Sequence, residues 1–280
     1  VYPNIENYFW ELINKGIKNA EKQFEAYGLR IIRRYVDSYK VEDQIAVINE
    51  LLEEYSLHGL AFVPLHPVKL NELIDNLTSR GIPVVTFDSD ATLSKRLCFI
   101  GDNAVKGGSI AGKLMGLFLG GKGNVVIMRG QKNLLPIQQR ITGFMEKIAA
   151  EFPDVKIVDS YDIYDDQGGY EKRIYNIISQ IFSDSPVKID GIFVTNTLIG
   201  LVGKAIKDIG IQNVKLIGFD YSETVETLLK EDMVSATICT DLNFEGYEAI
   251  RILYEYITAQ VKPKTDCIFT KYEIMIKETL

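Results

Sequence analysis

The sequence predicts an α/β protein made of two Rossmann-like lobes, each built around a parallel sheet. Two observations lead to this prediction. Short apolar strands alternate with amphipathic helices along nearly the whole chain, and one strand–helix–strand unit occurs twice, 132 positions apart. The pentapeptides TFDSD (86–90) and GFDYS (218–222) mark the repeat, and each follows a β-branched run. Why both runs end in Phe-Asp is the question that the sequence raises.

The composition is that of an ordinary globular chain. Of its 280 residues, 46% are hydrophobic and 25% are charged, which suits two lobes of roughly 100 to 150 residues. Lys and Arg number 31 against 38 Asp and Glu, and such a balance repels a phosphodiester backbone. We therefore expect no direct contact of this segment with nucleic acid. No apolar run approaches the roughly 18 residues of a spanning helix and no signal-peptide pattern opens the sequence, so we also expect no membrane contact.

The cysteines and histidines argue against disulfides and metals. Cys98, Cys239 and Cys267 are odd in number, far apart and without C-x-x-C spacing. His58 and His66 are the only histidines and form no H-E-x-x-H motif. We expect buried free thiols, no metal, no cofactor and a reducing, cytoplasmic location.

Helical spacing and apolar runs follow each other in a regular order. In the first half, apolar positions from Phe9 to Phe24 predict a helix, 59–64 a buried strand, 70–77 a helix and 82–87 a strand. In the second half the expected elements are strands at 124–128, 155–161 and 191–195, with helices around residues 141–148 and 174–181.

The repeat places one aspartate at the end of a strand in each lobe. Gly59 corresponds to Gly191 in the same alignment that matches Asp88 with Asp220. Ligands of open parallel sheets bind beyond the carboxyl ends of the strands. Two facing lobes would therefore direct both carboxylates into one ligand cleft. The alternative is that each aspartate only caps a turn or a helix.

Eight segments in order resemble a known family. They resemble the type I periplasmic-binding-protein fold, and more narrowly the effector-binding core of lactose-repressor-type (LacI/GalR) transcription regulators. The segments are ENYFWELINKGIKNAEKQ (6–23), GIPVVTFDSD (81–90), FIGDNAVKGGSIAG (99–112), QRITGF (139–144), DGIFVTN (190–196), KLIGFD (215–220), SATICTD (235–241) and GYEAIRIL (246–253).

The resemblance implies a set of ligand-binding residues. Aromatic rings would cover the apolar face of a sugar, while the guanidinium of Arg140 and the amide of Asn196 would bind its hydroxyls. Ser89, Thr240 and the residue after Asn196 depart from the usual family pattern, which affects the identity of the sugar. For the two aromatics at the start of the first helix a core role is the alternative, and for Arg140 an ion pair on a helix. The complete set is Asn7, Phe9, Trp10, Asp88, Ser89, Arg140, Tyr164, Asn196, Asp220 and Thr240.

The resemblance also implies domains, partners and a function. Lobe one would comprise 1–103 and 242–269, and lobe two 104–241 and 270–280. The chain would be the effector domain of a homodimeric cytoplasmic regulator that reaches DNA only through an N-terminal helix-turn-helix. That head would precede Val1, which falls late in the family's first strand. The effector would be a monosaccharide, a sugar acid or a cyclitol, because two carboxylates repel phosphate.

Two other classes of function stay open. One is a periplasmic solute-binding protein of a sugar transporter, or the input domain of a sensor kinase with the same fold. The other is an enzyme with Asp88 and Asp220 as acid and base, which would need carboxylates on both sides of one bond. We favour a binding protein with no catalytic residues.

Two glycine-rich segments imitate nucleotide-binding motifs. The segment 107–114 matches G-x-x-x-x-G-K, but it ends in Leu114, where a phosphate-binding loop needs Ser or Thr, and it continues a helical pattern. The segment 120–124 does not follow a first strand as a dinucleotide-binding turn must. We therefore reject nucleotide hydrolysis and dinucleotide binding.

Overall fold

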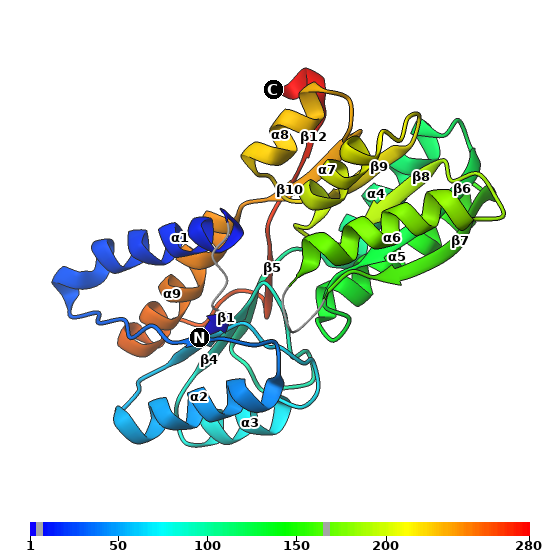
Figure 1. The fold of residues 1–280 in the computed structure, drawn as a ribbon. Coiled ribbons are helices and arrows are strands. Elements are labelled where there is room, and N and C mark those ends of the chain that lie inside the picture. Colours follow the sequence, from blue (N-terminus) through cyan, green and yellow to red (C-terminus); the bar gives the residue numbers. More distant parts are fainter. Residues whose placement is uncertain (4–7, 165–168) are drawn as a thin grey trace. The chain divides into compact units, whose positions relative to one another are not determined.

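The computed structural model describes residues 1–3, 8–164 and 169–280, and Figure 1 shows its ribbon. The chain forms two compact units, each with parallel-dominated sheets and flanking helices, which confirms the α/β prediction. Unit 1 contains Val1–Asp102, Asn133–Pro136 and Asp241–Lys271, and unit 2 contains Asn103–Lys132, Ile137–Thr240 and Tyr272–Leu280.

Unit 2 is built on a six-stranded sheet that helices cover on both faces. All neighbouring strands are parallel except β12, which runs antiparallel to β10. The strand order is β12 (Tyr272–Met275), β10 (Ala236–Thr240), β9 (Lys215–Phe219), β8 (Gly191–Val194), β6 (Lys122–Arg129), β7 (Asp154–Asp162). The helices are α4 (Ala104–Phe118), α5 (Leu135–Glu151), α6 (Tyr170–Asp184), α7 (Ile199–Ile209), α8 (Glu223–Lys230) and η2 (Lys277–Thr279).

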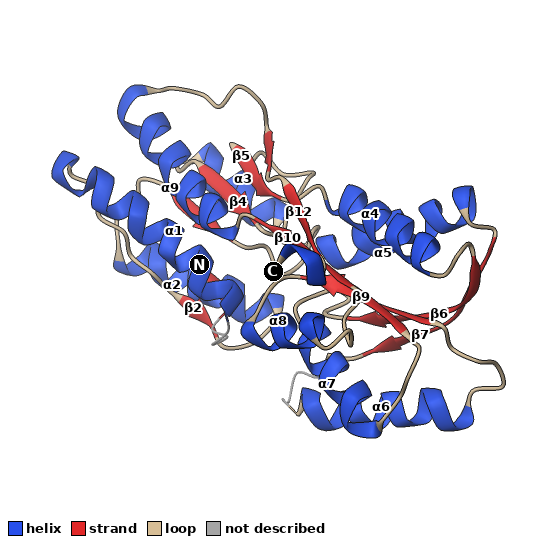
Figure 2. Cartoon of the chain, turned by 90° about the horizontal axis from the view of Figure 1, so that it is seen from above, coloured by secondary structure: helices blue, strands red, loops and turns tan. Residues whose placement is uncertain are grey.

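Each face of this sheet has its own core. One core packs α4 and α5 against the strands and contains the stacked rings of Phe144 and Phe193. The other packs α6, α7 and α8 against residues such as Val194 and Leu216. Figure 2 shows α4 and α5 on one side of strands β6 and β9, and α6 and α7 on the other. Strands buried on both faces explain the continuous apolar runs of the sequence.

Unit 1 has a four-stranded parallel sheet and a separate pair of short strands. Its sheet order is β11 (Cys267–Phe269), β5 (Cys98–Gly101), β4 (Val84–Phe87), β3 (Leu60–Phe62), and the pair is β1 (Tyr2–Pro3) with β2 (Tyr35–Val36). The helices are α1 (Tyr8–Phe24), η1 (Glu25–Tyr27), α2 (Val41–Glu54), α3 (Asn71–Ser79) and α9 (Leu242–Ala259). The core between α1, α9 and the sheet includes Ile13, Val85 and Ile100.

The 132-residue repeat of the sequence is also a repeat of hydrogen bonding. The backbone N–H of Asp88 donates to the carbonyl of Ile100 on the neighbouring strand, at 3.0 Å. The N–H of Asp220 donates to Ile238 in the same way, also at 3.0 Å. The two strand ends are therefore built alike.

Helix α4 follows β5 and helix α9 follows β10, and these two helices begin 138 positions apart. Asn103 caps α4, where its side chain accepts from the N–H of Lys106 at 3.1 Å. Asp241 caps α9 in the same manner and accepts from Phe244 at 2.9 Å. These side chains satisfy backbone donors that the first helical turn leaves unpaired.

In unit 2, α4 and α5 touch through glycine on both helices. A side chain at Gly108 would overlap the carbonyl oxygen of Arg140, and one at Gly143 would overlap that of Val105. The glycines of the G-x-x-x-x-G-K segment therefore lie inside α4 and serve helix packing. They form no phosphate-binding loop.

In unit 1, α1 and α9 touch by the same reciprocal arrangement. A side chain at Gly246 would overlap the carbonyl of Ile13, and one at Gly16 would overlap that of Asn243. Helices α1 and α5 have the same length of 17 residues, and they start 127 positions apart, at Tyr8 and Leu135. The two units thus share a helix pair as well as a strand end.

We predict that Gly108→Ala destabilises the protein by about 1–3 kcal/mol, because the new methyl group must push α4 and α5 apart. Gly200→Ala is the matched control in the same unit, since its new Cβ would be 3.5 Å from the nearest atom and alanine favours the helix by about 0.5–1 kcal/mol. Urea unfolding compares the two variants. Equal midpoints for both would contradict the predicted contact.

Candidate functional site

Several predicted ligand-binding residues lie at one edge of the unit 2 sheet. Asp220 directly follows β9, Asn196 comes two residues after β8, Tyr164 two residues after β7, and Thr240 is the last residue of β10. These strands are parallel to one another. Their carboxyl ends therefore meet at the same edge of the sheet, which is where open α/β sheets bind ligands.

Arg140 is fixed at this edge from the side of α5. Its side chain is buried, and its guanidinium lies over the ring of Phe219, 3.9 Å from the ring centroid. Its Nη1 donates to the carbonyl of Thr195 at 3.0 Å. The cation–π contact and the hydrogen bond hold the charged group between the ends of β8 and β9. Arg140 is thus buried at the strand ends, and its contact with a ligand stays a prediction.

Asn196 is held in place by two neighbours. Its Nδ2 donates to Oε1 of Gln131 at 3.5 Å, and its Oδ1 accepts from the N–H of Leu198 at 3.3 Å. Gly130 gives room for this side chain, because a Cβ there would overlap the Asn196 amide. Gln131 is a polar residue of the site that the sequence analysis missed, although its place just after a strand could have indicated it.

The two repeated aspartates share an uncommon backbone conformation. Asp88 has a φ of 61° and Asp220 a φ of 72°, which is the left-handed region. Asp enters this region more readily than most residues other than Gly. The carbonyl of Asp220 accepts from Oγ1 of Thr237 at 2.6 Å, which fastens the turn. Helix α8 is capped by Ser222, so Asp220 turns the chain at the strand end and does not cap that helix.

In unit 1, Asp88 and Ser89 follow β4. Asp88 is half-buried and Ser89 is fully buried. The Oγ of Ser89 has no hydrogen-bond partner among the described residues. A polar atom without a partner is costly to bury, and contact of Ser89 with a ligand stays a prediction.

Asp90, the second aspartate of the TFDSD segment, has a structural role. Its Oδ1 and Oδ2 accept from Arg96 at 2.5 and 2.7 Å, and Oδ1 also accepts from Thr86 at 2.7 Å. Arg96 in turn donates to the carbonyl of Asp266 at 2.8 Å. This buried network ties the loop after β4 to the segment before β11.

The aromatic residues at the start of α1 belong largely to the core. The ring of Trp10 is buried and stacks on Tyr2 at 5.3 Å between centroids. Phe9 is half-buried and meets Trp10 edge-on at 5.0 Å. Both rings pack on the core of unit 1, and contact of either ring with a ligand stays a prediction. Asn7 lies outside the described residues.

Tyr164 and Thr240 are both half-buried. The ring of Tyr164 lies 5.4 Å from that of Tyr170. Thr240 pairs with Tyr272 across the antiparallel end of the sheet. Contact of either residue with a ligand stays a prediction.

The thiols are not activated. Burial, followed by the nearby charge of Asp220, raises the pKa of Cys239 to about 12, and burial raises the pKa of Cys98 to about 11. Both are free and buried as predicted, while Cys267 is free and half-buried. Such thiols stay protonated at neutral pH and make poor nucleophiles. Within residues 1–3, 8–164 and 169–280, no group of three or more His, Cys, Asp or Glu side chains could hold a metal ion.

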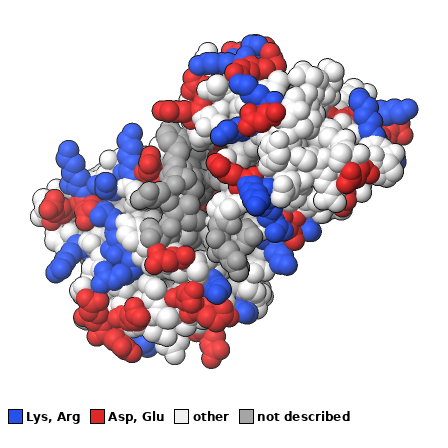
Figure 3. All heavy atoms as spheres, in the orientation of Figure 1, with Lys and Arg blue, Asp and Glu red and all other residues white. Residues whose placement is uncertain are grey.

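The surface offers no large patch of one charge on the face drawn in Figure 3, where acidic and basic side chains are interspersed. Over the part of the chain that the structure covers, none of the helices combines the length and the apolar character needed to span a bilayer.

Two compact α/β units, each with a left-handed turn after one of its strands, place the chain in the two-unit α/β class. Residues 1–260 match the model of the periplasmic binding protein domain, and the chain belongs to this family. The type I periplasmic-binding-protein fold suggested by the sequence is thereby confirmed.

The relatives found by sequence are sugar- and polyol-binding proteins. The ribose import binding protein RbsB of Bacillus subtilis is 24% identical over 236 residues, which cover 84% of this chain and 72% of the relative. The xylitol-binding protein of Mycolicibacterium smegmatis is 24% identical over 209 residues, covering 74% of this chain and 58% of the relative.

Solved structures show the same fold. A glucose-galactose binding protein, GanP, from Geobacillus stearothermophilus has a TM-score of 0.87 at 22% identity, with 100% and 96% of the two chains covered. A solute binding protein from Burkholderia graminis, in complex with D-arabinose, has a TM-score of 0.89 at 23% identity, with 99% and 94% covered. A putative LacI transcriptional regulator from Bacteroides fragilis has a TM-score of 0.88 at 21% identity, with 99% and 96% covered.

The left-handed turn at Asp220 predicts that glycine is better tolerated there than alanine, which is the reverse of their order inside a helix. At Asp220, glycine should be better tolerated than alanine by about 1–2 kcal/mol, because alanine strains in the left-handed region. At Lys204, an exposed residue inside α7, alanine should be better than glycine by about 1 kcal/mol. Unfolding free energies of the four variants test this, and alanine as the better residue at both positions would refute it.

Proposed function

We propose that this chain is a sugar- or polyol-binding protein that works as the solute-binding component of a transporter. The observation that carries the proposal is the edge of the unit 2 sheet, where Arg140 is held over Phe219 beside Asn196 and Asp220. These side chains are buried, and together they present a cation, an amide and a carboxylate.

This set of groups suits neighbouring hydroxyls. A hydroxyl both donates and accepts, so it can bind a carboxylate oxygen and a guanidinium N–H at once. Hydrogen bonds to charged groups contribute about 1.5–3 kcal/mol each. A phosphate would instead meet the charge of Asp220, so a neutral or singly anionic ligand fits better.

The relatives support a transporter role more than a regulator role. Ribose import proteins and a xylitol-binding protein are among them, and similar structures bind D-arabinose or tagatopyranose. We therefore place the ligand among pentoses, hexoses and their alditols. The chain acts without catalysis in this proposal, since the related proteins are named for binding.

A sugar-responsive transcription regulator is the second candidate. One observation favours it, the likeness in fold to a putative LacI regulator. The homodimer, the DNA-binding head and the cytoplasmic location belong to this candidate and stay predictions.

We predict that a pentose or its alditol binds with a Kd in the micromolar range, about −8 kcal/mol. A thermal-shift screen with D-ribose, D-arabinose, xylitol, D-glucose, D-glucuronate and myo-inositol identifies the ligand, and titration calorimetry measures it. Asp220→Asn and Arg140→Lys should weaken binding tenfold or more, because each loses a charge-assisted or two-pronged hydrogen bond.

The control for these variants is Asp208→Asn, which removes the same charge from an exposed position in α7. It should bind as the parent chain does. If all three variants bind alike, or if only nucleotides or amino acids shift the melting temperature, the proposed site is wrong.

The oligomeric state separates the two candidates. A solute-binding protein should scatter light as a single chain of 31.6 kDa at micromolar concentration, with and without sugar. A stable mass of twice this value would instead favour the regulator candidate.

A further inference from the structure

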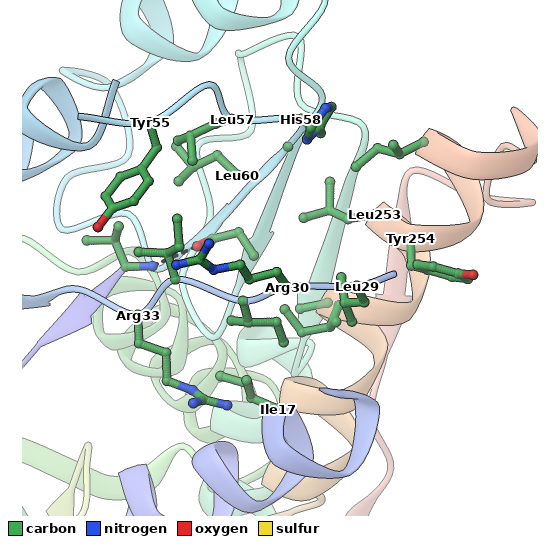
Figure 4. Close-up of a pocket in the computed structure, with 18 of the residues that line it drawn as sticks. Ile17, Leu29, Arg30, Arg33, Tyr55, Leu57, His58, Leu60, Leu253 and Tyr254 are labelled. Carbon is green, nitrogen blue, oxygen red and sulfur yellow. Dashed lines mark hydrogen bonds between the residues drawn. The ribbon is translucent and has the colours of Figure 1, made fainter. Parts of the chain in front are cut away.

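A cavity of about 530 Å³ lies inside unit 1 (Figure 4). None of the predicted ligand-binding residues lines it, and apolar side chains such as Leu57, Leu60 and Leu253 form much of its wall. Each buried hydroxyl of a sugar needs a polar partner, so this cavity suits a sugar less well than the strand ends of unit 2 do. The groups that hold those strand ends in shape therefore bear on binding as well.

Thr237 is a polar residue in an apolar part of unit 2. It lies on β10 and is fully buried. Successive residues of a strand face opposite sides of the sheet, and Ile238 belongs to the core that α4 and α5 cover, so Thr237 faces the side of α6, α7 and α8. A hydroxyl is costly to bury unless it makes a hydrogen bond. Valine has nearly the same shape without that cost, so the hydroxyl calls for an explanation.

The hydroxyl of Thr237 has a defined partner in Asp220. Its Oγ1 donates to the carbonyl oxygen of Asp220 at 2.6 Å, which is a normal length for an O–H···O bond. Thr237 lies opposite Gly218 on the neighbouring strand β9, and glycine brings no side chain of its own to this place. The bond therefore reaches across to the end of β9, which Asp220 directly follows.

Asp220 is anchored to β10 through both of its peptide groups. Its N–H donates to the carbonyl of Ile238 at 3.0 Å, and its own carbonyl accepts from Thr237. The two peptide planes that flank a residue determine the direction of its Cα–Cβ bond. Because both planes are held, the carboxylate leaves the backbone in a direction that two consecutive residues of β10 set.

Unit 1 shows that the left-handed turn itself does not need this hydroxyl. Asp88 has the same conformation and donates its N–H to the carbonyl of Ile100. By this correspondence the counterpart of Thr237 is Phe99, which has no hydroxyl. At these matched positions the hydroxyl is therefore a feature of unit 2, and the turn alone does not explain it.

We propose that Thr237 is a positioning residue for ligand binding, which acts through Asp220. Its hydroxyl holds the Asp220 carbonyl and so fixes the direction in which the carboxylate meets the hydroxyls of a sugar. A group that is fixed before binding loses little conformational freedom when the ligand arrives. The inference rests on the proposed function, because it takes the Asp220 carboxylate as a ligand-binding group.

Three variants at position 237 separate the hydroxyl from the size of the side chain. Thr237→Val keeps the branched shape without the hydroxyl, Thr237→Ser keeps the hydroxyl without the methyl group, and Thr237→Ala keeps neither. Titration calorimetry measures the binding of D-ribose, or of the compound in the screen above that shifts the parent chain most. Thr237→Val should weaken binding about tenfold relative to the parent chain, and Thr237→Ala about tenfold relative to Thr237→Ser, since each pair differs in the hydroxyl.

A second measurement needs no sugar. Hydrogen exchange at the Asp220 amide reports how often the turn opens, and it should be about fivefold faster or more in the two variants without a hydroxyl. Thr227→Val is the matched control in the same unit. It removes a hydroxyl that donates to the carbonyl of Glu223 at 2.9 Å from an exposed position in α8, and it should change neither binding nor exchange at Asp220.

An Asp220→Gly chain tests whether Thr237 acts through the carboxylate. Glycine adopts the left-handed turn readily and removes the group that is positioned. In this chain Thr237→Val should change the affinity by less than about twofold, because a residue that acts through a missing group has no further effect.

Several results would overturn the proposal. Affinity that follows side-chain size, with Thr237→Val equal to the parent chain and Thr237→Ser equal to Thr237→Ala, makes Thr237 a packing residue. Equal weakening by Thr237→Val in the parent and Asp220→Gly chains, or equal exchange at Asp220 in all variants at position 237, leads to the same conclusion. If Thr237→Val does not fold, Thr237→Ser against Thr237→Ala decides alone. If the parent chain binds none of the screened compounds, the proposed function itself fails, so the two failures are distinguishable.

Discussion

Each unit depends on one pair of helices that approach so closely that only glycine fits at the contact. In unit 2, the carbonyl of Arg140 lies against Gly108, so the packing of α4 on α5 sets the height of Arg140 above the sheet. From that height its guanidinium reaches Phe219 and the carbonyl of Thr195. A larger residue at the helix contact would move the charged group away from both partners. The position of Arg140 in the candidate site is thus decided by the backbone packing of α4 on α5.

The strand ends impose the second constraint. Asp88 and Asp220 both adopt the left-handed conformation and both donate to the adjacent strand. Asparagine and glycine also adopt this conformation readily, so the backbone alone does not require a carboxylate. The turn therefore accounts for a residue of this small class at each strand end, and contact of either carboxylate with a ligand stays a prediction. This is the answer that the structure gives to the repeated Phe-Asp.

Much of this arrangement could be predicted from the sequence, and the rest could not, for physical reasons. The 132-residue repeat was visible because strand residues and the following aspartate recur as short similar strings. The spacing of 127 residues between α1 and α5 could not be seen in the sequence. Single glycines such as Gly16 and Gly143, which mark these helices, have no distinctive neighbours. The surroundings of Trp10 could not be predicted either, because an aromatic residue at a helix start can face the core or a ligand, and here its ring stacks on Tyr2. The partner of Asn196, Gln131, comes from a different strand end, and side chains that meet only through folding have no shared pattern in the sequence.

The repeat also shows which side chains the two units carry at corresponding positions. By the same spacings, Arg140 corresponds to Ile13 and Asn196 to Pro64, while Asp220 corresponds to Asp88. Ile13 is fully buried in the core of unit 1, and proline offers no side-chain donor or acceptor. The backbone positions are retained, but only the aspartate retains its polar group in both units. In the function proposed above, unit 2 therefore supplies the guanidinium and the amide that distinguish one arrangement of hydroxyls from another. At the positions that correspond by these spacings, unit 1 has a carboxylate but neither of the other two groups, so the polar chemistry of the strand ends differs between the units.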